Sequence, residues 1–298
     1  MASANVFDVA KKMGFWYGKE PFRFWKAYSG GNYFGEPKSF SLREFFILNS
    51  LAPSLKLSYD SEELPLSVKP DKQVAVTDVM ALLRATYEGT DWDTTKNLKV
   101  PSKKKDSSDK DSITSPAANP WMTTDMINML NEVKPRTVDS NRLVAVPQCS
   151  YSHVIQLRNW LPDAVGGVAW LSFDNPGQSP RIPIFSGSTA LPPSFGICGQ
   201  HRHRTDAAIW SLREANKLAT VRWGLTKEKM QTAIAHFEEK GQTELPFVEA
   251  QYKQIQQTKG DEAANAYLTG YTSDFAGAAM QRWREMADEF WKMFARGF

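Results

Sequence analysis

The segment from Gln148 to Pro183 constrains the fold more than any other part of the chain. It contains two runs of strand-forming residues, Gln148–Arg158 and Val168–Phe173. A Gly-Gly pair lies directly before the second run, where glycine permits a close approach of two backbones. A third run follows at Arg181–Phe185. The short connections predict antiparallel strands rather than parallel strands joined by crossover helices.

The first run presents two different faces, because side chains alternate along a strand. One face is the more apolar and is expected to pack under a layer of helices. Its members are Cys149, Tyr151, His153, Ile155 and Leu157. The members of the other face are Ser150, Ser152, Val154, Gln156 and Arg158. Buried polar groups need hydrogen-bond partners, so this polar face indicates an internal network, a solvent-facing strand or one wall of a binding site.

A turn with polar side chains follows the second run, at Asp174-Asn175-Pro176-Gly177. Asp and Asn side chains accept hydrogen bonds from nearby backbone amides, so a self-contained turn is the simpler interpretation. Because the turn ends a strand of the predicted core, Asn175 remains a candidate neighbour of a binding site, with Asp174 beside it.

The rest of the chain predicts helices around this β-rich centre, which also includes a strand over Leu143–Val146. Helices are predicted at Val6–Met13, at Leu42–Asn49 after an N-cap at Ser41, after a cap at Thr77, and at Trp121–Val133, Asp206–Val221, Lys227–Lys240, Val248–Gln257 and Ser273–Phe294. The stretch 99–116 predicts a polar surface loop, and residues 205–298 are expected to be mainly helical. Together these elements predict a single α+β domain over residues 1–298.

Apolar side chains recur at helical spacing along the last predicted helix. They are Met280, Trp283, Met286, Phe290, Trp291 and Phe294. Such a stripe indicates core packing or a subunit interface, which leaves a homo-oligomer open.

Charge and composition exclude two classes of partner. The 298 residues carry a formal net charge of +3, which is too small to predict binding to nucleic acid. No apolar run approaches the ~20 residues that span a bilayer, so no membrane partner is expected. The first residues show no signal-peptide pattern, and the compartment is left open.

Two cysteines, Cys149 and Cys198, are too few for a disulfide framework, and unpaired thiols are expected. Cys198 begins a Cys-Gly-Gln-His-Arg-His sequence, but the flanking arginines oppose a cation and no second ligand pair is near. No metal and no other cofactor is therefore expected. Cys149 and His153 share a strand face but lie ~13 Å apart as residues i and i+4 of a strand, too far for direct proton transfer.

Several blocks of the sequence together resemble the dipeptidases of the N-terminal-nucleophile (Ntn) cysteine hydrolases. The blocks are Ser67–Asp93 (SVKPDKQVAVTDVMALLRATYEGTDWD), Asn119–Met126 (NPWMTTDM), Cys149–Pro176 and Phe185–Phe195 (FSGSTALPPSF). They occur in the order of that family, and the resemblance extends from near the start of the chain to at least Thr220. It implies hydrolysis of dipeptides by a cysteine thiol, without a metal. It also implies a four-layer αββα sandwich, in which helices enclose two antiparallel sheets.

In such enzymes the nucleophile is a cysteine at the start of the mature chain, and its own α-amine acts as general base. This chain starts Met1-Ala2-Ser3, and both of its cysteines lie far from that end. The resemblance therefore implies the C-terminal portion of a dipeptidase, with the nucleophile in an N-terminal part that is missing. No catalytic residue is assigned within the chain.

The polar strand face and the turn supply the candidates for binding a dipeptide. They are Arg158, Gln156, Ser150, Ser152 and Asn175. Arg158 is the foremost candidate, because a guanidinium can hold the carboxylate of a dipeptide through two hydrogen bonds. The alternative is a non-catalytic pseudo-enzyme, or a subunit that pairs with a separate nucleophile-bearing chain. An incomplete chain is expected to expose sheet edges and apolar faces.

Overall fold

The computed structural model describes residues 3–28, 39–61, 64–102 and 112–297. They belong to two compact units, one within residues 1–73 and the other within residues 74–298. The second unit contains the β-rich centre and all of the candidate binding residues. A single domain over residues 1–298 stays a prediction.

The first unit consists of short helices and aromatic contacts. Its elements are α1 (Val6–Lys12), α2 (Phe24–Tyr28), α3 (Ser39–Leu51) and the 3-10 helix η1 (Pro53–Leu55). α1 ends before Gly14, whose φ of +71° is a conformation that glycine adopts without strain. The ring of Phe22 contacts the rings of Phe7 and Trp16, with centroids 4.7 and 5.1 Å apart. α3 already includes Ser39, so the N-cap predicted at Ser41 is wrong.

The first helix of the second unit is α4 (Val76–Leu83), and it begins before the cap predicted at Thr77. The carboxylate of Asp78 accepts a hydrogen bond from the backbone N–H of Ala75 at 2.9 Å. An acidic side chain one turn into the helix thus satisfies the free N–H group, and Thr77 lies inside the helix. The predicted cap at Thr77 is wrong for this reason.

The stretch 99–116, predicted as a polar surface loop, contains two short strands. β1 (Lys99–Pro101) pairs antiparallel with β2 (Ser112–Thr114), and five of the six residues are exposed. Residues 103–111 between them lie outside the described part of the chain. The ends of this stretch therefore form a ladder at the surface, which the polar composition did not predict.

The helix α5 (Thr124–Val133) ends as predicted but begins three residues after Trp121, because Oγ1 of Thr123 caps it by accepting a hydrogen bond from the N–H of Met126 at 3.2 Å. The strand predicted over Leu143–Val146 is wrong. This segment joins no ladder among the described residues, although the carbonyl of Ala145 accepts a hydrogen bond from the indole of Trp121 at 2.8 Å. A buried apolar segment held by isolated hydrogen bonds has the same sequence pattern as a short strand.

The centre of the second unit is a three-stranded antiparallel sheet in the order β3-β4-β5. Its strands are β3 (Tyr151–Leu157), β4 (Gly167–Phe173) and β5 (Ile182–Phe185), and α6 (Asp163–Gly166) connects the first two. Val154 lies opposite Trp170, which in turn lies opposite Pro183. A Cβ added to Gly166 would lie 2.8 Å from the carbonyl of Arg158, so the predicted close backbone approach is confirmed.

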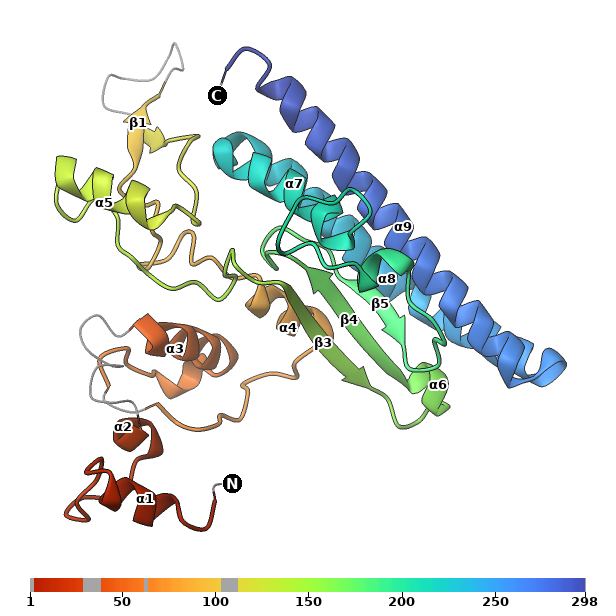
Figure 1. The fold of residues 1–298 in the computed structure, drawn as a ribbon, viewed down its shortest axis with the longest axis horizontal. Helices are drawn as coiled ribbons and strands as arrows, with labels where there is room; N and C mark the ends of the chain where they lie inside the picture. Colours follow the sequence, from red (N-terminus) through yellow and green to blue (C-terminus); the bar gives the residue numbers. More distant parts are fainter. Residues whose placement is uncertain (1–2, 29–38, 62–63, 103–111, 298) are drawn as a thin grey trace. The chain divides into compact units, whose positions relative to one another are not determined.

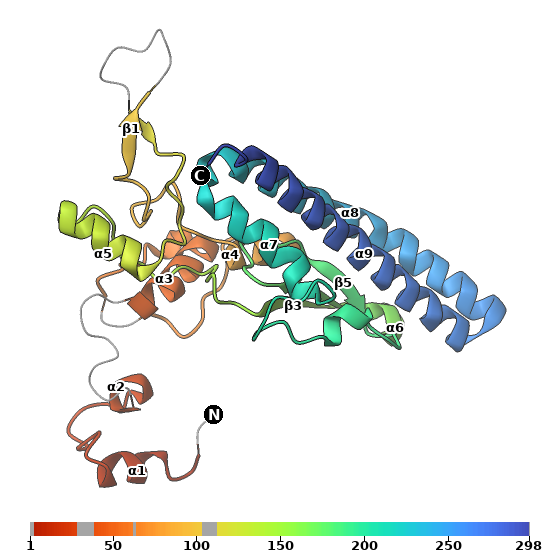
Figure 2. The ribbon, with the colours of Figure 1, turned by 45° about the horizontal axis from the view of Figure 1, so that its top comes forward.

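Long helices follow the sheet. After the 3-10 helix η2 (Pro193–Gly196) they are α7 (Ala208–Val221), α8 (Trp223–Lys259) and α9 (Asp261–Met293). Figures 1 and 2 show α8 and α9 side by side, with the sheet along one side of the pair. No helix in the described ranges is long and apolar enough to cross a bilayer.

The structure has one helix, α8, where two were predicted at Lys227–Lys240 and Val248–Gln257. The helix continues through Pro246, which lacks the N–H group that a helix interior uses. Leu245 and Val248 on either side are 5% and 2% exposed. Burial of these neighbours in the core keeps the helix continuous where proline removes a hydrogen bond.

The hydrophobic core of the second unit lies between the sheet and the helices α4, α8 and α9. Its buried members are Met80, Val154, Val165, Val168, Trp170, Phe185, Leu245, Val248, Tyr252, Ala264 and Leu268. Trp170 is fully buried, and a Cβ added to Gly241 of α8 would lie 2.8 Å from its ring. The absence of a side chain at Gly241 thus lets α8 approach the sheet closely.

The α+β class predicted from the sequence is confirmed. The apolar stripe of the last helix belongs to the core, since Trp283, Met286 and Phe290 of α9 are buried. Trp291 is the exception, at 49% exposed. The described residues contain the three-stranded sheet and the two-stranded ladder, and the αββα sandwich stays a prediction.

Candidate functional site

The structure reverses the predicted orientation of β3: its polar face is covered and its apolar face is exposed. Val154 is 7% exposed and lies opposite Trp170, so the face that also contains Ser152 and Gln156 is turned toward the helices. The apolar residues of the other face are exposed: Tyr151 58%, Ile155 54% and Leu157 77%. The prediction that this apolar face packs under helices is wrong. Val154 and Trp170 complete the core, and hydrogen bonds satisfy the polar groups beside them.

The two candidate serines have different surroundings. Oγ of Ser150 accepts a hydrogen bond from the side-chain amide of Gln200 at 2.9 Å, at the exposed end of β3. Oγ of Ser152 accepts a hydrogen bond from Nη1 of Arg181 at 3.1 Å, toward the interior. One serine thus bonds to a surface loop and the other to a buried cation.

Gln156 and Arg158 are engaged within the second unit. Oε1 of Gln156 accepts a hydrogen bond from the indole N–H of Trp170 at 3.0 Å. Arg158 is 9% exposed, and its guanidinium forms an ion pair with Glu249 of α8 and donates to the carbonyl of Val165 at 2.5 Å. The structure therefore gives both side chains a structural contact, and their role in substrate binding stays a prediction.

Asn175 is 1% exposed and bonds to its own turn. Its Oδ1 accepts a hydrogen bond from the N–H of Gly177 at 2.9 Å, and its Nδ2 donates to Oε1 of Gln178 at 2.9 Å. Asn175 therefore stabilises its own turn through local hydrogen bonds, as expected for an Asn side chain. A contact of Asn175 with substrate stays a prediction.

The same turn is connected to the helices by Asp174, which is fully buried. Its carboxylate accepts hydrogen bonds from Nε of Arg213 at 2.6 Å and from Nδ2 of Asn216 at 2.9 Å, both on α7. Oδ1 of Asn216 accepts a hydrogen bond from the indole of Trp283 on α9 at 3.0 Å. The end of β4 is therefore connected to two helices by a satisfied polar network.

Both cysteines are free thiols, as predicted. Sγ of Cys149 donates to the carbonyl of Tyr151 at 3.0 Å, and burial raises the pKa of this thiol. His153 stacks on the ring of Tyr151, with centroids 6.1 Å apart. Burial thus favours the neutral thiol form of Cys149.

The Cys-Gly-Gln-His-Arg-His sequence lies in the loop before α7. Cys198 is exposed, and the ring of His203 contacts the ring of Trp210 with centroids 4.8 Å apart. In the described ranges, no three His, Cys, Asp or Glu side chains gather in an arrangement that could hold a metal ion.

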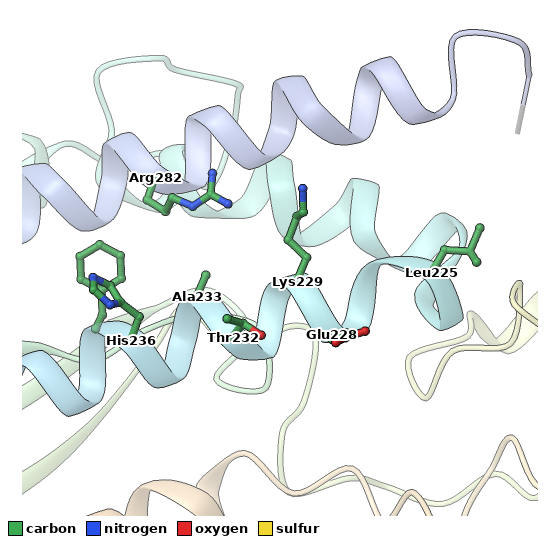
Figure 3. Close-up of a pocket in the computed structure, with 8 residues that line it drawn as sticks. Leu225, Glu228, Lys229, Thr232, Ala233, His236 and Arg282 are labelled. Atoms are coloured by element: carbon green, nitrogen blue, oxygen red, sulfur yellow. The ribbon is translucent and has the colours of Figure 1, made fainter.

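A groove of about 750 Å³ lies between α8 and α9, and Figure 3 shows its side chains. It is lined by Leu225, Glu228, Lys229, Thr232, Ala233, His236, Phe237 and Arg282. Its two cations are both paired with Glu289, Arg282 at 3.0 Å and Lys229 through its ammonium group. None of the five candidate residues lines this groove, so it is separate from the predicted site.

Sequence analysis missed a buried cation next to the polar face of β3. Arg181 is fully buried, and so is Ser172, which lies opposite Ser152 in the ladder. The available signal was a charged residue directly before the apolar strand Ile182–Phe185. The contact of Arg181 with Ser152 cannot be seen in the first strand alone, because the two residues are far apart in the sequence.

Comparison with known proteins supports the same family as the quoted blocks. The family model described as "Peptidase family C69" matches residues 1–236 of the chain. A protein of Latilactobacillus sakei named "Probable dipeptidase" is 25% identical over 146 residues, which are 49% of this chain and 24% of that protein. "Probable dipeptidase B" of Streptococcus pyogenes serotype M1 is 27% identical over 141 residues, 47% of this chain and 23% of that protein. The match thus spans about a quarter of the length of these relatives.

The family match includes the whole sheet, α7 and the first part of α8. The polar face of β3, the Asp174 turn and the buried Arg181 therefore all lie within the matched region. The resemblance drawn from the quoted blocks is confirmed at the level of the family. The chain belongs to peptidase family C69.

Proposed function

We propose that this chain is one part of a cysteine-type dipeptidase, and that the nucleophile lies in an N-terminal part outside residues 1–298. Membership of a peptidase family and the names of the two curated relatives support the dipeptidase activity. Neither thiol of the chain suits the role of an N-terminal nucleophile. Cys149 and Cys198 both lie in mid-chain and have no α-amine to act as general base.

The observation that carries this proposal is the open face of the sheet. Tyr151, Ile155 and Leu157 expose more than half of their surface on β3, and Leu171 and Phe173 beside them on β4 are half-buried. Contiguous exposed apolar side chains mark a contact surface in a soluble protein. Two sheets pack face to face at ~10 Å. We assign this face to the second sheet of an αββα sandwich, formed by the nucleophile-bearing part.

In this proposal the substrate pocket of the assembled enzyme lies at the outer edge of β3, where the open face meets the helix-covered face, and the five polar candidates form or support it from the covered side. Arg158 binds the carboxylate of the dipeptide, and its ion pair with Glu249 breaks when the substrate binds. The variant Arg158→Lys keeps the charge but loses the two-pronged geometry, so KM for a dipeptide rises while kcat changes little. Glu249→Gln is the matched control, because it frees the guanidinium and does not raise KM. A lowered melting temperature of Arg158→Lys with unchanged KM assigns Arg158 a purely structural role.

The experiment for the function itself is reconstitution. The purified chain alone is expected not to hydrolyse a dipeptide such as Ala-Ala. Production together with the polypeptide encoded directly upstream of Met1, with its first cysteine at the mature N-terminus, restores hydrolysis. Iodoacetamide abolishes the restored activity. The double variant Cys149→Ala/Cys198→Ala keeps it, because neither thiol acts as nucleophile.

Two outcomes contradict the proposal. Hydrolysis by the chain alone that is lost in Cys149→Ala places the nucleophile inside this chain. An upstream sequence without an early cysteine, together with an inactive chain, favours the non-catalytic protein instead.

A further inference from the structure

A buried guanidinium under the sheet has hydrogen-bond donors without an acceptor among the described residues. Arg181 is fully buried, and Nη1 donates to Oγ of Ser152 at 3.1 Å. Within the described ranges its Nε and Nη2 are buried without a partner, and so is Oγ of Ser172. Buried donors without acceptors are rare in folded proteins because each is costly. These three donors therefore indicate an acceptor at this place.

The charges around Arg181 do not balance. In the described ranges, Arg158 pairs with Glu249 and Arg213 pairs with Asp174. Among the described residues, the remaining charged groups near Arg181 are Arg84 and Glu238, whose charges both act on its guanidinium. Glu238 forms its ion pair with Arg84, so two cations share one carboxylate.

Arg181 nevertheless keeps its charge at neutral pH. Burial lowers the pKa of its guanidinium to about 10, which is still well above neutrality. A charge in the protein interior is stable only when a counter-charge is near. A water molecule would accept the hydrogen bonds but would leave this charge uncompensated.

The two donors of Arg181 without a partner in the described ranges lie on the same edge of its guanidinium. Nε and Nη2 form one edge of the planar guanidinium, the edge that binds anions through two parallel N–H groups. Ser172 lies directly opposite Ser152, which already contacts Nη1, and directly opposed residues have Cβ atoms ~5 Å apart. The ladder thus places Ser172 next to the serine that contacts the guanidinium. Both side chains are fully buried, so an acceptor that reaches them must be small, and a single atom fits this better than a polyatomic ligand.

We propose that Arg181 and Ser172 bind a monoatomic anion, chloride under ordinary conditions, in the interior of the second unit. The anion accepts hydrogen bonds from Nε and Nη2 of Arg181 and from Oγ of Ser172, and it supplies the missing negative charge. This site is independent of the proposed dipeptidase function, because it is complete within the chain and stabilises the sheet under the helices.

The test measures the free energy of unfolding as a function of chloride concentration. Gluconate replaces chloride so that the ionic strength stays constant. Above its dissociation constant, each tenfold rise in chloride raises the folding equilibrium constant of the full chain about tenfold. Arg181→Gln loses this dependence. Ser172→Ala, which is expected to fold because it removes only a hydroxyl, shifts the dependence to higher chloride. Crystals grown in bromide show an anomalous peak within contact distance of the guanidinium.

Ser188→Ala is the matched control, since its Oγ is also buried without a partner but lies away from the ladder position of Ser172. Its chloride dependence equals that of the unmodified chain. Equal stability of the unmodified chain in chloride and gluconate overturns the proposal. So does a bromide crystal with a water at Arg181, or a Ser188→Ala variant whose dependence shifts to higher chloride as that of Ser172→Ala does.

Discussion

The two faces of the β3-β4-β5 sheet are made of opposite kinds of residues and have opposite surroundings. The face with Ser152, Gln156 and Ser172 is covered by helices, whereas the face with Tyr151 and Leu157 is open. Hydrophobicity alone predicts the reverse. The difference teaches that one large pair, Val154 and Trp170, determines which face is buried when hydrogen bonds satisfy the polar groups around it. The four predictions below test this contrast.

The largest effect is expected from Trp170→Ala. The ring is fully buried between the sheet and α8, so its loss lowers the free energy of unfolding by about 3–5 kcal/mol. Urea denaturation followed by circular dichroism measures the change. Trp160→Ala is the matched control, because Trp160 lies in the turn after β3 and is 75% exposed. A comparable loss in Trp160→Ala contradicts the assignment of covered and open faces.

Two glycines of the long helices give the next contrast. A Cβ at Gly241 would lie 2.8 Å from the ring of Trp170, so Gly241→Ala forces α8 from the sheet and costs about 1–3 kcal/mol. Gly277 of α9 has nothing within 4 Å of the corresponding point, so Gly277→Ala stabilises the helix by about 0.5–1 kcal/mol. Thermal denaturation of the two variants is expected to give shifts of opposite sign. Shifts of the same sign exclude a tight contact between α8 and the sheet.

A titratable group beneath the covered face gives a prediction about pH. Burial raises the pKa of Glu238 above its ordinary value of 4.5, against the opposing effect of Arg84. A carboxyl with a raised pKa in the folded state contributes stability below its unfolded pKa, and this contribution is lost as pH rises through the folded pKa. The free energy of unfolding of the unmodified chain, relative to Glu238→Gln, therefore falls as pH rises above the ordinary value of 4.5. Urea denaturation across this range measures it, and a rising difference would show that ion pairing outweighs burial.

The smallest change in stability is expected on the open face. Leu157→Ser alters a side chain that is 77% exposed, so the free energy of unfolding changes by less than about 0.5 kcal/mol. Self-association of the chain, measured by sedimentation velocity, decreases because the apolar surface is smaller. Val154→Ser on the opposite face of the same strand is the matched control and costs at least about 2 kcal/mol. Equal losses in the two variants would mean that this chain itself covers the open face.

Sequence patterns predicted the α+β class, the antiparallel meander and the extents of β4 and α7 closely. They failed where tertiary contacts decide the outcome. Pro246 suggested a break, but the buried Leu245 and Val248 keep α8 continuous. The alternation of β3 identified its two faces but not their orientation, which depends on Trp170, a residue of the neighbouring strand. The alternation along β3 also gives no information about its contact with Arg181, because that contact depends on how β3, β4 and β5 pair.

The meander also has a consequence for synthesis on the ribosome. β3, β4 and β5 pair in the order in which they leave the ribosome, so the sheet needs no later segment to form its hydrogen bonds. The helices that bury Trp170 come later, since α9 ends at Met293, more than a hundred residues after the tryptophan. At a synthesis rate of about 5–20 residues per second, the ring of Trp170 stays exposed for on the order of ten seconds before α8 and α9 are complete. During that interval both faces of the nascent sheet are open, and Trp170 on one face and Leu157 on the other are exposed together, which makes this segment the expected binding site of a ribosome-associated chaperone.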